Sequence, residues 1–448
     1  MLDLFQDLKI DEQKLHQKYK IIKNNLFLTG EHEILKDWIN GFEDRDNKIV
    51  KEFQTTFHSS FWEFYLYAVF KKLNFKIDFS ENRPDFIVKS PTELYIEAVV
   101  SNIKQTGEKE EERTFDDILG MLNPPHLQDD FYQKLDESIV RHSNAILSKS
   151  KKYLCKYSKL DYINTEVPYI IALSGYDQIN YGNQYIYPMM ALLFGAYYNI
   201  DSDAYQRRES IMKPNSEAKI DIGLFNNKDF EHISAIIFSA TITLGKLTSL
   251  SLSQNKSSLK TNFVINIRHD TDKPNWQLQL INENDCEDLT DGLFIFHNPF
   301  AKNKLDENIF KDTGIMEIKQ GENGHTFENN RLPLFSRFNN FGKHNFIINS
   351  LMFETFNKFN AKDHIRMSFF KILEIDFNIQ PKEVTLLDIE LNLQFIVDLK
   401  QEDIDFIKNN NLKENDSIIA IIYATLDKFG NTTQWNFQML QQIHNKTE

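Results

Sequence analysis

The sequence predicts an α/β protein in which a central mixed sheet is flanked by helices, followed by a C-terminal α+β region. Three observations support this fold class. An amphipathic helical pattern at 51–75 precedes three short strand-like runs. The fully apolar runs at 167–175 and 233–240 are typical of strands that are buried on both faces. After residue 305 the pattern changes to alternating short strands and helices.

Length and composition indicate a globular protein with more than one compact unit. The chain has 448 residues, of which 41% are hydrophobic and 26% charged. Its two cysteines, Cys155 and Cys286, offer no disulfide framework or metal spacing, so we expect a reducing, cytoplasmic location. The longest apolar run is about 12 residues, whereas a membrane span needs about 20, so no membrane association is expected.

The domain boundaries follow from these changes in pattern. We expect an N-terminal helical segment at 1–50 and an α/β core at 51–305. A linker is expected at 306–339 and a separate α+β region at 340–448.

The core is expected to begin with one long helix. Phe53, Phe57, Phe61 and Tyr65 recur at steps of four and form one apolar stripe. Glu63 lies at the border of this buried face. The elements that we expect to follow are strands at 75–79, 85–89 and 94–100, a helix at 130–158, and strands at 167–175, 233–240, 263–268 and 292–299.

Two acids lie within the stretch RPDFIVKSPTELYIEAVV, which reads as a hairpin. Pairing that is symmetric about Pro91 places Asp85 directly opposite Glu97, with Cβ atoms roughly 5 Å apart on one face. Two carboxylates at this separation repel unless a cation lies between them or one stays protonated. A hard divalent cation such as Mg²⁺ satisfies such a pair, although two solvent-facing acids on an edge hairpin are an ordinary alternative.

These residues resemble the PD-(D/E)XK restriction-endonuclease-like superfamily. RPDF and YIEAVV are preceded by the helix with Glu63 and followed by a basic helix. More narrowly, KEFQTTFHSSFWEFYL, RPDF, IEAVV and HNPFAKNKL resemble an uncharacterised bacterial branch of that superfamily. The resemblance covers roughly 40–305 and implies a restriction-endonuclease-like core that cleaves nucleic acid with Mg²⁺ or Mn²⁺.

The resemblance also implies roles for individual residues. Asp85 would be the main metal ligand, Glu97 the second, and the carbonyl group of Ala98 a third. Glu63 would match the helix acid that supports the metal or its water molecules in many members.

The chain departs from the family pattern at one position. The lysine expected two residues after Glu97 is replaced by Val99, which brings catalysis into question. Some members carry this cation on a neighbouring element, and the candidates here are Arg141, Lys149 and Lys104. Among them we expect Lys149 to be the catalytic cation. The alternative interpretation of each candidate is an ordinary solvent-exposed side chain.

The charge distribution gives conflicting indications about whether the chain binds nucleic acid. A net charge of −14 opposes non-specific binding to phosphates. However, 141–160 and 240–268 contain no acid, and they carry Arg141, Lys149, Lys152 and Lys246, which we expect to contact nucleic acid. Solvated basic faces are the simpler interpretation of both stretches.

Two functions remain open. The first is a metal-dependent nuclease, with DNA as the expected substrate, that acts in restriction or phage defence. The second is a nuclease fold that has lost its lysine and serves as a nucleic-acid-binding or protein-interaction module. The sequence leaves open whether the chain forms a homodimer.

Overall fold

A computed structural model describes residues 2–102, 123–125, 128–177, 185–256, 262–270, 275–321, 324–329, 331–341, 351–352, 355, 365–389, 393–426 and 432–443. The chain divides into two compact units, Met1–Lys343 and His344–Glu448.

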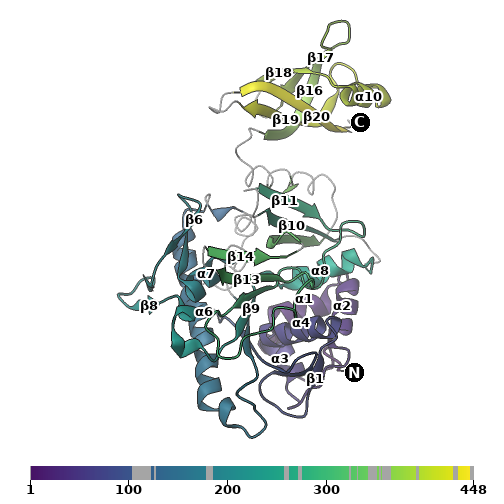
Figure 1. Ribbon diagram of the computed structural model, residues 1–448. Helices are drawn as coiled ribbons and strands as arrows, with labels where there is room; N and C mark the ends of the chain where they lie inside the picture. The colour runs from purple at the N-terminus through teal and green to yellow at the C-terminus, as the bar shows by residue number, and fades with distance from the viewer. Residues whose placement is uncertain are drawn as a thin grey trace. The chain divides into compact units, whose positions relative to one another are not determined.

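An eight-stranded mixed sheet forms the centre of the first unit (Figure 1). In spatial order its strands are β1 (Lys76–Asp78), β2 (Phe86–Ser90), β3 (Leu94–Val100), β4 (Tyr169–Ser174), β9 (Ala235–Ser239), β12 (Phe294–His297), β13 (Met316–Gly321) and β14 (Gly324–Glu328). Strands β3, β4 and β9 are parallel to one another, whereas β1, β2 and β3 pair antiparallel. The predicted α/β class with a mixed sheet is confirmed.

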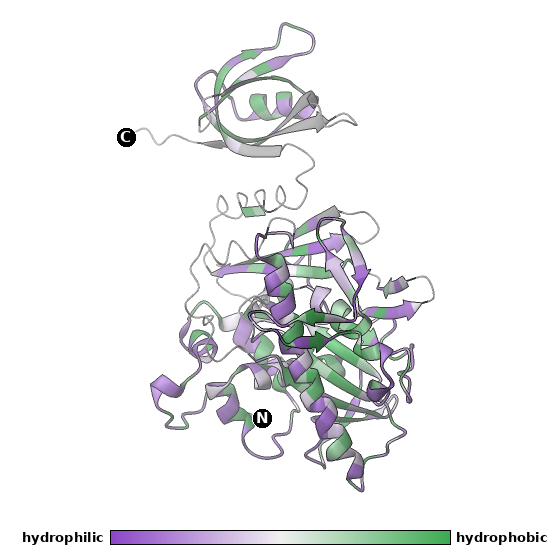
Figure 2. Cartoon of the chain, turned by 90° about the vertical axis from the view of Figure 1, so that its left-hand side faces the viewer, coloured by the Kyte–Doolittle hydropathy of each residue, from purple (hydrophilic) through white to green (hydrophobic). Residues whose placement is uncertain are grey.

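Helices cover both faces of this sheet. The helix α4 (His58–Lys72) contacts β3 from one side, and Ile96 and Ala98 join the apolar cluster that contains its side chains. The alternate residue, Glu97, faces α6 (Phe131–Cys155) on the other side. The strands β4 and β9 are buried along their whole length, and the apolar colouring in Figure 2 runs through the interior of this unit.

The helix predicted at 51–75 is interrupted. The structure has two helices, α3 (Ile49–Thr55) and α4, and the chain changes direction between them at Phe57. Phe57 has φ +54°, a left-handed conformation that is uncommon for a bulky residue. Its ring is fully buried, so tertiary packing overrides the local helical pattern at this position.

The N-terminal segment and the predicted linker both belong to the first unit. The helices α1 (Gln17–Asn24) and α2 (Thr29–Ile39) share the apolar cluster of α4, so 1–50 is not a separate body. Residues 306–339 contain β13, β14 and most of β15 (Leu334–Phe341), so the linker prediction was wrong. The cause is non-local pairing, which short-range patterns do not show.

Further elements surround this sheet. The predicted strand at 263–268 exists as β10 (Asn262–Asp270), but it forms a separate three-stranded sheet with β11 (Asn275–Leu280) and β15. The remaining elements of the unit include α7 (Tyr187–Phe194), α8 (Leu244–Ser253), the hairpin of β5 (Ala196–Asn199) with β6 (Ala204–Arg207), and the hairpin of β7 (Ser210–Met212) with β8 (Lys219–Asp221).

The second unit confirms the predicted C-terminal α+β region, with its boundary at residue 344 instead of 340. Its five antiparallel strands follow the order β18 (Leu393–Asp398), β17 (Glu383–Asp388), β16 (Ile365–Asp376), β19 (Ser417–Leu426) and β20 (Thr432–Ile443). The helix α10 (Gln401–Asn409) connects β18 to β19, and the outer strands β18 and β20 also contact each other. This connectivity corresponds to a small Greek-key barrel of the OB type.

Among the described residues, no helix is both long enough and apolar enough to span a membrane.

Candidate active site

The hairpin of β2 and β3 has the register that the sequence predicts. The paired residues are Phe86 with Ile96, Ile87 with Tyr95, and Val88 with Leu94. Continuing this register by one residue places Asp85 opposite Glu97. The Oδ2 atom of Asp85 accepts a hydrogen bond from the backbone N–H of Ala98 at 2.7 Å, which turns its carboxyl group toward β3.

Arg45 fixes the loop that leads into Asp85. Its guanidinium group donates hydrogen bonds to the carbonyl oxygens of Glu81 at 2.6 Å, Pro84 at 3.4 Å and Asp85 at 2.9 Å. The planar guanidinium offers several donors in a fixed geometry, so one side chain can hold three backbone groups. Arg45 therefore orients the backbone at the first acid of the site.

Glu97 is buried, and its two carboxylate oxygens have different surroundings. Only 1% of the residue is exposed. Its Oε1 atom accepts hydrogen bonds from Lys149 Nζ at 2.7 Å, Lys152 Nζ at 3.0 Å and the Tyr157 hydroxyl group at 3.1 Å. Its Oε2 atom is buried and has no hydrogen-bond partner within the described part of the chain. A buried oxygen without a donor is costly, so Oε2 marks a position where a cation or donor would be stabilising.

The two lysines come from α6, where residues three apart lie on the same face. Val99 lies two residues after Glu97 on β3, so both side chains point to the face that α6 covers. The side chains of Lys149 and Lys152 are 19% and 35% exposed, respectively. The helix α6 thus places two lysines beside Glu97, and the lysine expected two residues after this glutamate is replaced by Val99.

Two acids of the site, Asp85 and Glu63, have raised pKa values. Burial, and then the charge of Glu97, raise the pKa of Asp85 to about 6, despite the opposing effect of Lys149. Burial, and then the charge of Asp85, raise the pKa of Glu63 well above its usual value. Asp85 therefore interacts with Glu63 on α4 and with Glu97 on β3.

Two other predicted site residues lie elsewhere. Arg141 is two turns from Lys149 on α6, and its nearest ion-pair contact is Glu137 at 3.6 Å. Lys246 is fully buried and donates to Glu287 Oε1 at 2.6 Å. A nucleic acid cannot reach this ammonium group, which corrects the expectation for Lys246. Lys104 lies outside the described residues.

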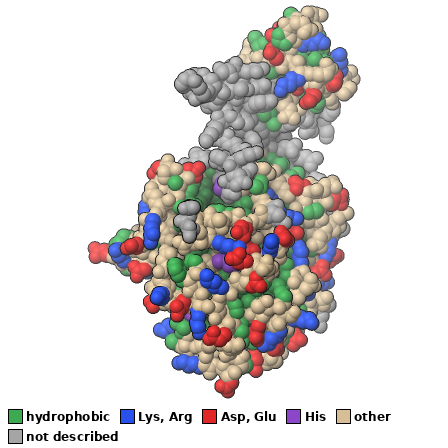
Figure 3. Space-filling view, viewed as in Figure 1, with side chains coloured by type: hydrophobic (Ala, Val, Ile, Leu, Met, Phe, Trp, Pro, Cys, Tyr) green, Lys and Arg blue, Asp and Glu red, His purple; other side chains and the backbone are tan. Residues whose placement is uncertain are grey.

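Within its described residues, 240–256 and 262–268, the second basic stretch is likewise not an open cationic surface. Arg268 is buried and pairs with Asp291 at 2.9 Å, and Lys256 pairs with Asp37. On the face shown in Figure 3, Lys and Arg side chains are interspersed with Asp and Glu. Near the candidate site, the described cations include Arg45 and the two α6 lysines, Lys149 and Lys152.

The donor set of the site fits a hard cation. Asp85 and Glu97 supply carboxylate oxygens, and Mg²⁺ commonly uses only one or two carboxylates, with water molecules and phosphate oxygens completing its coordination. Among the described residues, no group of three or more His, Cys, Asp or Glu side chains is arranged to hold a metal ion by itself. Asp85 and Glu97 could therefore supply only part of the coordination of such a cation, with water molecules or phosphate oxygens as the remaining ligands.

Sequence reasoning missed two residues of this site. Tyr157 lies in a 3-10 turn, Tyr157–Lys159, which directly follows α6 and brings its hydroxyl group back to Glu97. Arg45 comes from the connection between α2 and α3. The position of Tyr157 within the basic stretch at 141–160 was the one available signal, whereas nothing local to Arg45 indicated its role.

Comparisons with protein-family models, with curated protein sequences and with solved structures found no match to this chain.

Proposed function

We propose that the chain is a metal-dependent nuclease with a restriction-endonuclease-like core, and that DNA is its substrate. The observation that carries this proposal is the arrangement around Glu97. Its Oε1 atom holds Lys149, its Oε2 atom has no partner among the described residues, and Asp85 is placed opposite by the hairpin register. This combination supplies two metal ligands and a cation for a phosphate.

Asp85 and Glu97 are the residues that would hold the ion, with the carbonyl group of Ala98 as the third proposed ligand. A bound Mg²⁺ would polarise a phosphate oxygen and lower the pKa of a water molecule. Burial raises the pKa of Asp85 first and the charge of Glu97 second, and a bound divalent ion would offset the second of these effects.

The protein's own side chains have separate roles in this proposal. Lys149 would pair with the phosphate to be cleaved and stabilise the negative charge that develops on it. Tyr157 and Lys152 hold the Oε1 atom of Glu97, which keeps the carboxylate in one orientation. Burial raises the pKa of Glu63 well above its usual value, which favours the protonated form, and this form would donate a hydrogen bond within the site.

A second function is favoured by a specific observation. Val99 stands where the family lysine is expected, and both available lysines already neutralise Glu97. A catalytically inactive nuclease fold that binds nucleic acid or a protein would have the same ion pairs. The connectivity of the C-terminal unit is also compatible with such a role, because OB-type barrels bind oligonucleotides or oligosaccharides in other proteins, although a fold alone shows no function.

A cleavage assay separates these functions. The full chain is incubated with double-stranded DNA, single-stranded DNA and RNA, with Mg²⁺, with Mn²⁺ or with EDTA. We expect metal-dependent cleavage of DNA by the wild type and its loss in Asp85→Ala and Glu97→Gln. Lys213→Met, which changes an exposed lysine in the first unit, is the control and should cleave like the wild type.

The outcomes have different meanings. Equal cleavage by the wild type and Asp85→Ala would assign the activity to another site or a contaminant. Binding of nucleic acid without cleavage of any substrate would favour the inactive nuclease fold. The absence of both would favour a protein partner.

A further inference from the structure

A second cavity lies on the α4 side of the large sheet, away from Glu97. It has a volume of about 470 Å³, within the range of small-molecule sites. Its apolar surface comes from α2, α4 and α8, through residues such as Ile34, Trp38, Ala68 and Leu250. Its polar surface comes from three cations, three acids and three uncharged polar side chains: Lys71, Lys72, Arg331, Asp37, Glu287, Asp288, Ser253, Gln254 and Cys286. The cavity thus joins an apolar wall to a charged rim.

The acids beside this cavity are already neutralised. Glu287 is fully buried between Lys246 at 2.6 Å and Arg337. Burial alone would raise the pKa of Glu287, but these two cations hold it well below its usual value. Glu287 therefore stays ionised and contributes no uncompensated charge to the cavity.

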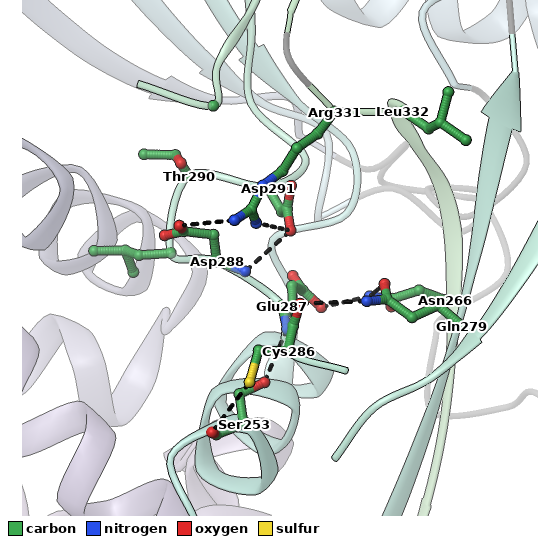
Figure 4. Close-up of polar contacts among 12 residues, drawn as sticks. Ser253, Asn266, Gln279, Cys286, Glu287, Asp288, Thr290, Asp291, Arg331 and Leu332 are labelled. Carbon is green, nitrogen blue, oxygen red and sulfur yellow. Dashed lines mark hydrogen bonds and ion pairs between the residues drawn. The ribbon is translucent and has the colours of Figure 1, made fainter. Parts of the chain in front are cut away.

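The two aspartates of the same loop are shared among several cations. Figure 4 shows the guanidinium group of Arg331 between Asp288 and Asp291, at 3.5 Å and 3.4 Å, respectively. Asp288 also pairs with Lys72, and Asp291 also pairs with Arg268. Two carboxylates thus face three cations here, and the Arg331 side chain is 43% exposed.

Lys71 adds a further positive charge, and its hydrogen-bond partners are carbonyl oxygens instead of a carboxylate. Its ammonium group donates to the carbonyl oxygens of Asp37 at 2.6 Å and Asn40 at 2.9 Å. The Asp37 carboxylate pairs with Lys256 instead. Three cations and three acids line the cavity, and each of these acids is paired with a cation, two of them with cations outside the lining. The surroundings of the cavity therefore carry a net positive charge in a chain whose net charge is −14.

We propose that this cavity binds a mononucleotide, with its phosphate group at Lys71, Lys72 and Arg331 and its base against the apolar wall. Charge complementarity favours a phosphate, which accepts several hydrogen bonds and pairs readily with arginine. The wall that includes Trp38 and Leu250 suits a flat, largely apolar ring, and the Gln254 amide can bond to its edge. The site is separate from the proposed nuclease centre and does not depend on it.

Cys286 provides a direct reporter for this site. It is exposed and lines the cavity, and the chain contains only one other cysteine, Cys155. In Figure 4 its side chain points toward Ser253, whose carbonyl oxygen lies 3.4 Å from the thiol sulfur. In a Cys155→Ser background, labelling by a thiol reagent therefore reports occupancy of this cavity.

The experiment measures the labelling rate of Cys286 in Cys155→Ser protein, in EDTA, with adenosine monophosphate, adenosine or inorganic phosphate. At ten times its Kd, a ligand that excludes the reagent slows labelling roughly tenfold. We expect this protection from adenosine monophosphate and much weaker protection from the other two compounds. Calorimetric titration with adenosine monophosphate gives a second measure of binding.

Four variants test whether nucleotide protection depends on the cations that line this cavity. Lys71→Met and Arg331→Met should weaken nucleotide protection, whereas Lys213→Met and Asp85→Asn should leave it unchanged. Thermal unfolding of each variant shows whether it is folded. Unchanged labelling and no heat of binding would overturn the proposal. Equal protection by adenosine would overturn the role of the cations, and equal protection by inorganic phosphate would overturn the role of the apolar wall.

Discussion

The ammonium group of Lys149 lies 2.7 Å from the Oε1 atom of Glu97, although the two residues are 52 positions apart in the chain. The helix α6, on one face of the sheet, thus places a lysine beside β3, whose own motif lacks the expected lysine. This pair can serve a nuclease, because the same ammonium group can neutralise a phosphate. It can also be a purely structural ion pair, and the two roles make different predictions.

Lys149 and Lys152 are predicted to differ in their effect on cleavage. Lys149 makes the shorter contact with Glu97 and is the more buried of the two, so Lys149→Met should lower kcat roughly 100-fold or more. Lys152→Met should have a smaller effect, because Tyr157 and Lys149 still hold Glu97. Lys151→Met, an exposed neighbour on α6, is the matched control in a steady-state cleavage assay. Equal rates for Lys149→Met and Lys151→Met would assign Lys149 a structural role.

The raised pKa of Asp85 predicts a pH-dependent cost to stability. The pKa of Asp85 is about 6 in the folded chain, compared with an ordinary value of 3.8. The stability that depends on the protonated carboxyl group is therefore complete below pH 3.8 and is lost as pH rises through about 6. Asp85→Asn removes this cost and retains an acceptor for the Ala98 N–H. The variant should be more stable than the wild type at pH 7.5 by about 1–3 kcal/mol.

Urea unfolding at a series of pH values measures this effect. The stability difference between Asp85→Asn and the wild type should shrink toward zero below pH 4. A constant difference across this range would show that Asp85 does not titrate as the site requires. For activity the sign is opposite, because metal binding needs the carboxylate, so cleavage should rise as pH passes through about 6.

The burial of Lys246 predicts a structural role. Lys246→Met leaves Glu287 with one of its two cations and should lower the free energy of unfolding by about 3–5 kcal/mol. Denaturant unfolding checks the loss, with Lys213→Met as the control for a lysine that is exposed. A stable Lys246→Met protein with weakened DNA binding would restore the role that the sequence indicated.

Truncation tests the boundary between the two units. The second unit has its own apolar core, with Phe370, Ile372 and Leu386 fully buried. A chain that ends at Lys343 should therefore unfold cooperatively by circular dichroism. A chain that ends at Leu305, the boundary predicted from sequence, removes β13 and β14 from the large sheet and should not fold. Identical behaviour of the two truncations would contradict this division.

The local parts of this structure were accessible from the sequence. The register of the β2–β3 hairpin follows from a short turn about Pro91, and alternating side chains then determine which residues share a face. The apolar runs of β4 and β9 and the length of α6 also follow from local pattern. These features depend on residues close together in the chain.

The missed features depend on distant contacts. The break at Phe57 occurs in a strongly helical pattern that has no glycine or proline, so only packing explains it. The departure of β10 from the large sheet depends on its pairing with β15, which is far away in sequence. Arg45 joins the site only because the first unit folds its N-terminal segment against the α/β core.

Binding of Mn²⁺ is the most direct test of the proposed metal site at Asp85 and Glu97, because it requires no knowledge of the substrate. Electron paramagnetic resonance can count the free ion in titrations of the wild type, Asp85→Asn, Glu97→Gln and the Lys213→Met control. We expect the wild type and the control to bind Mn²⁺ equally and each carboxyl variant to lose at least roughly tenfold in affinity. Equal binding by all four proteins, or no binding by the wild type, would contradict the proposed metal site.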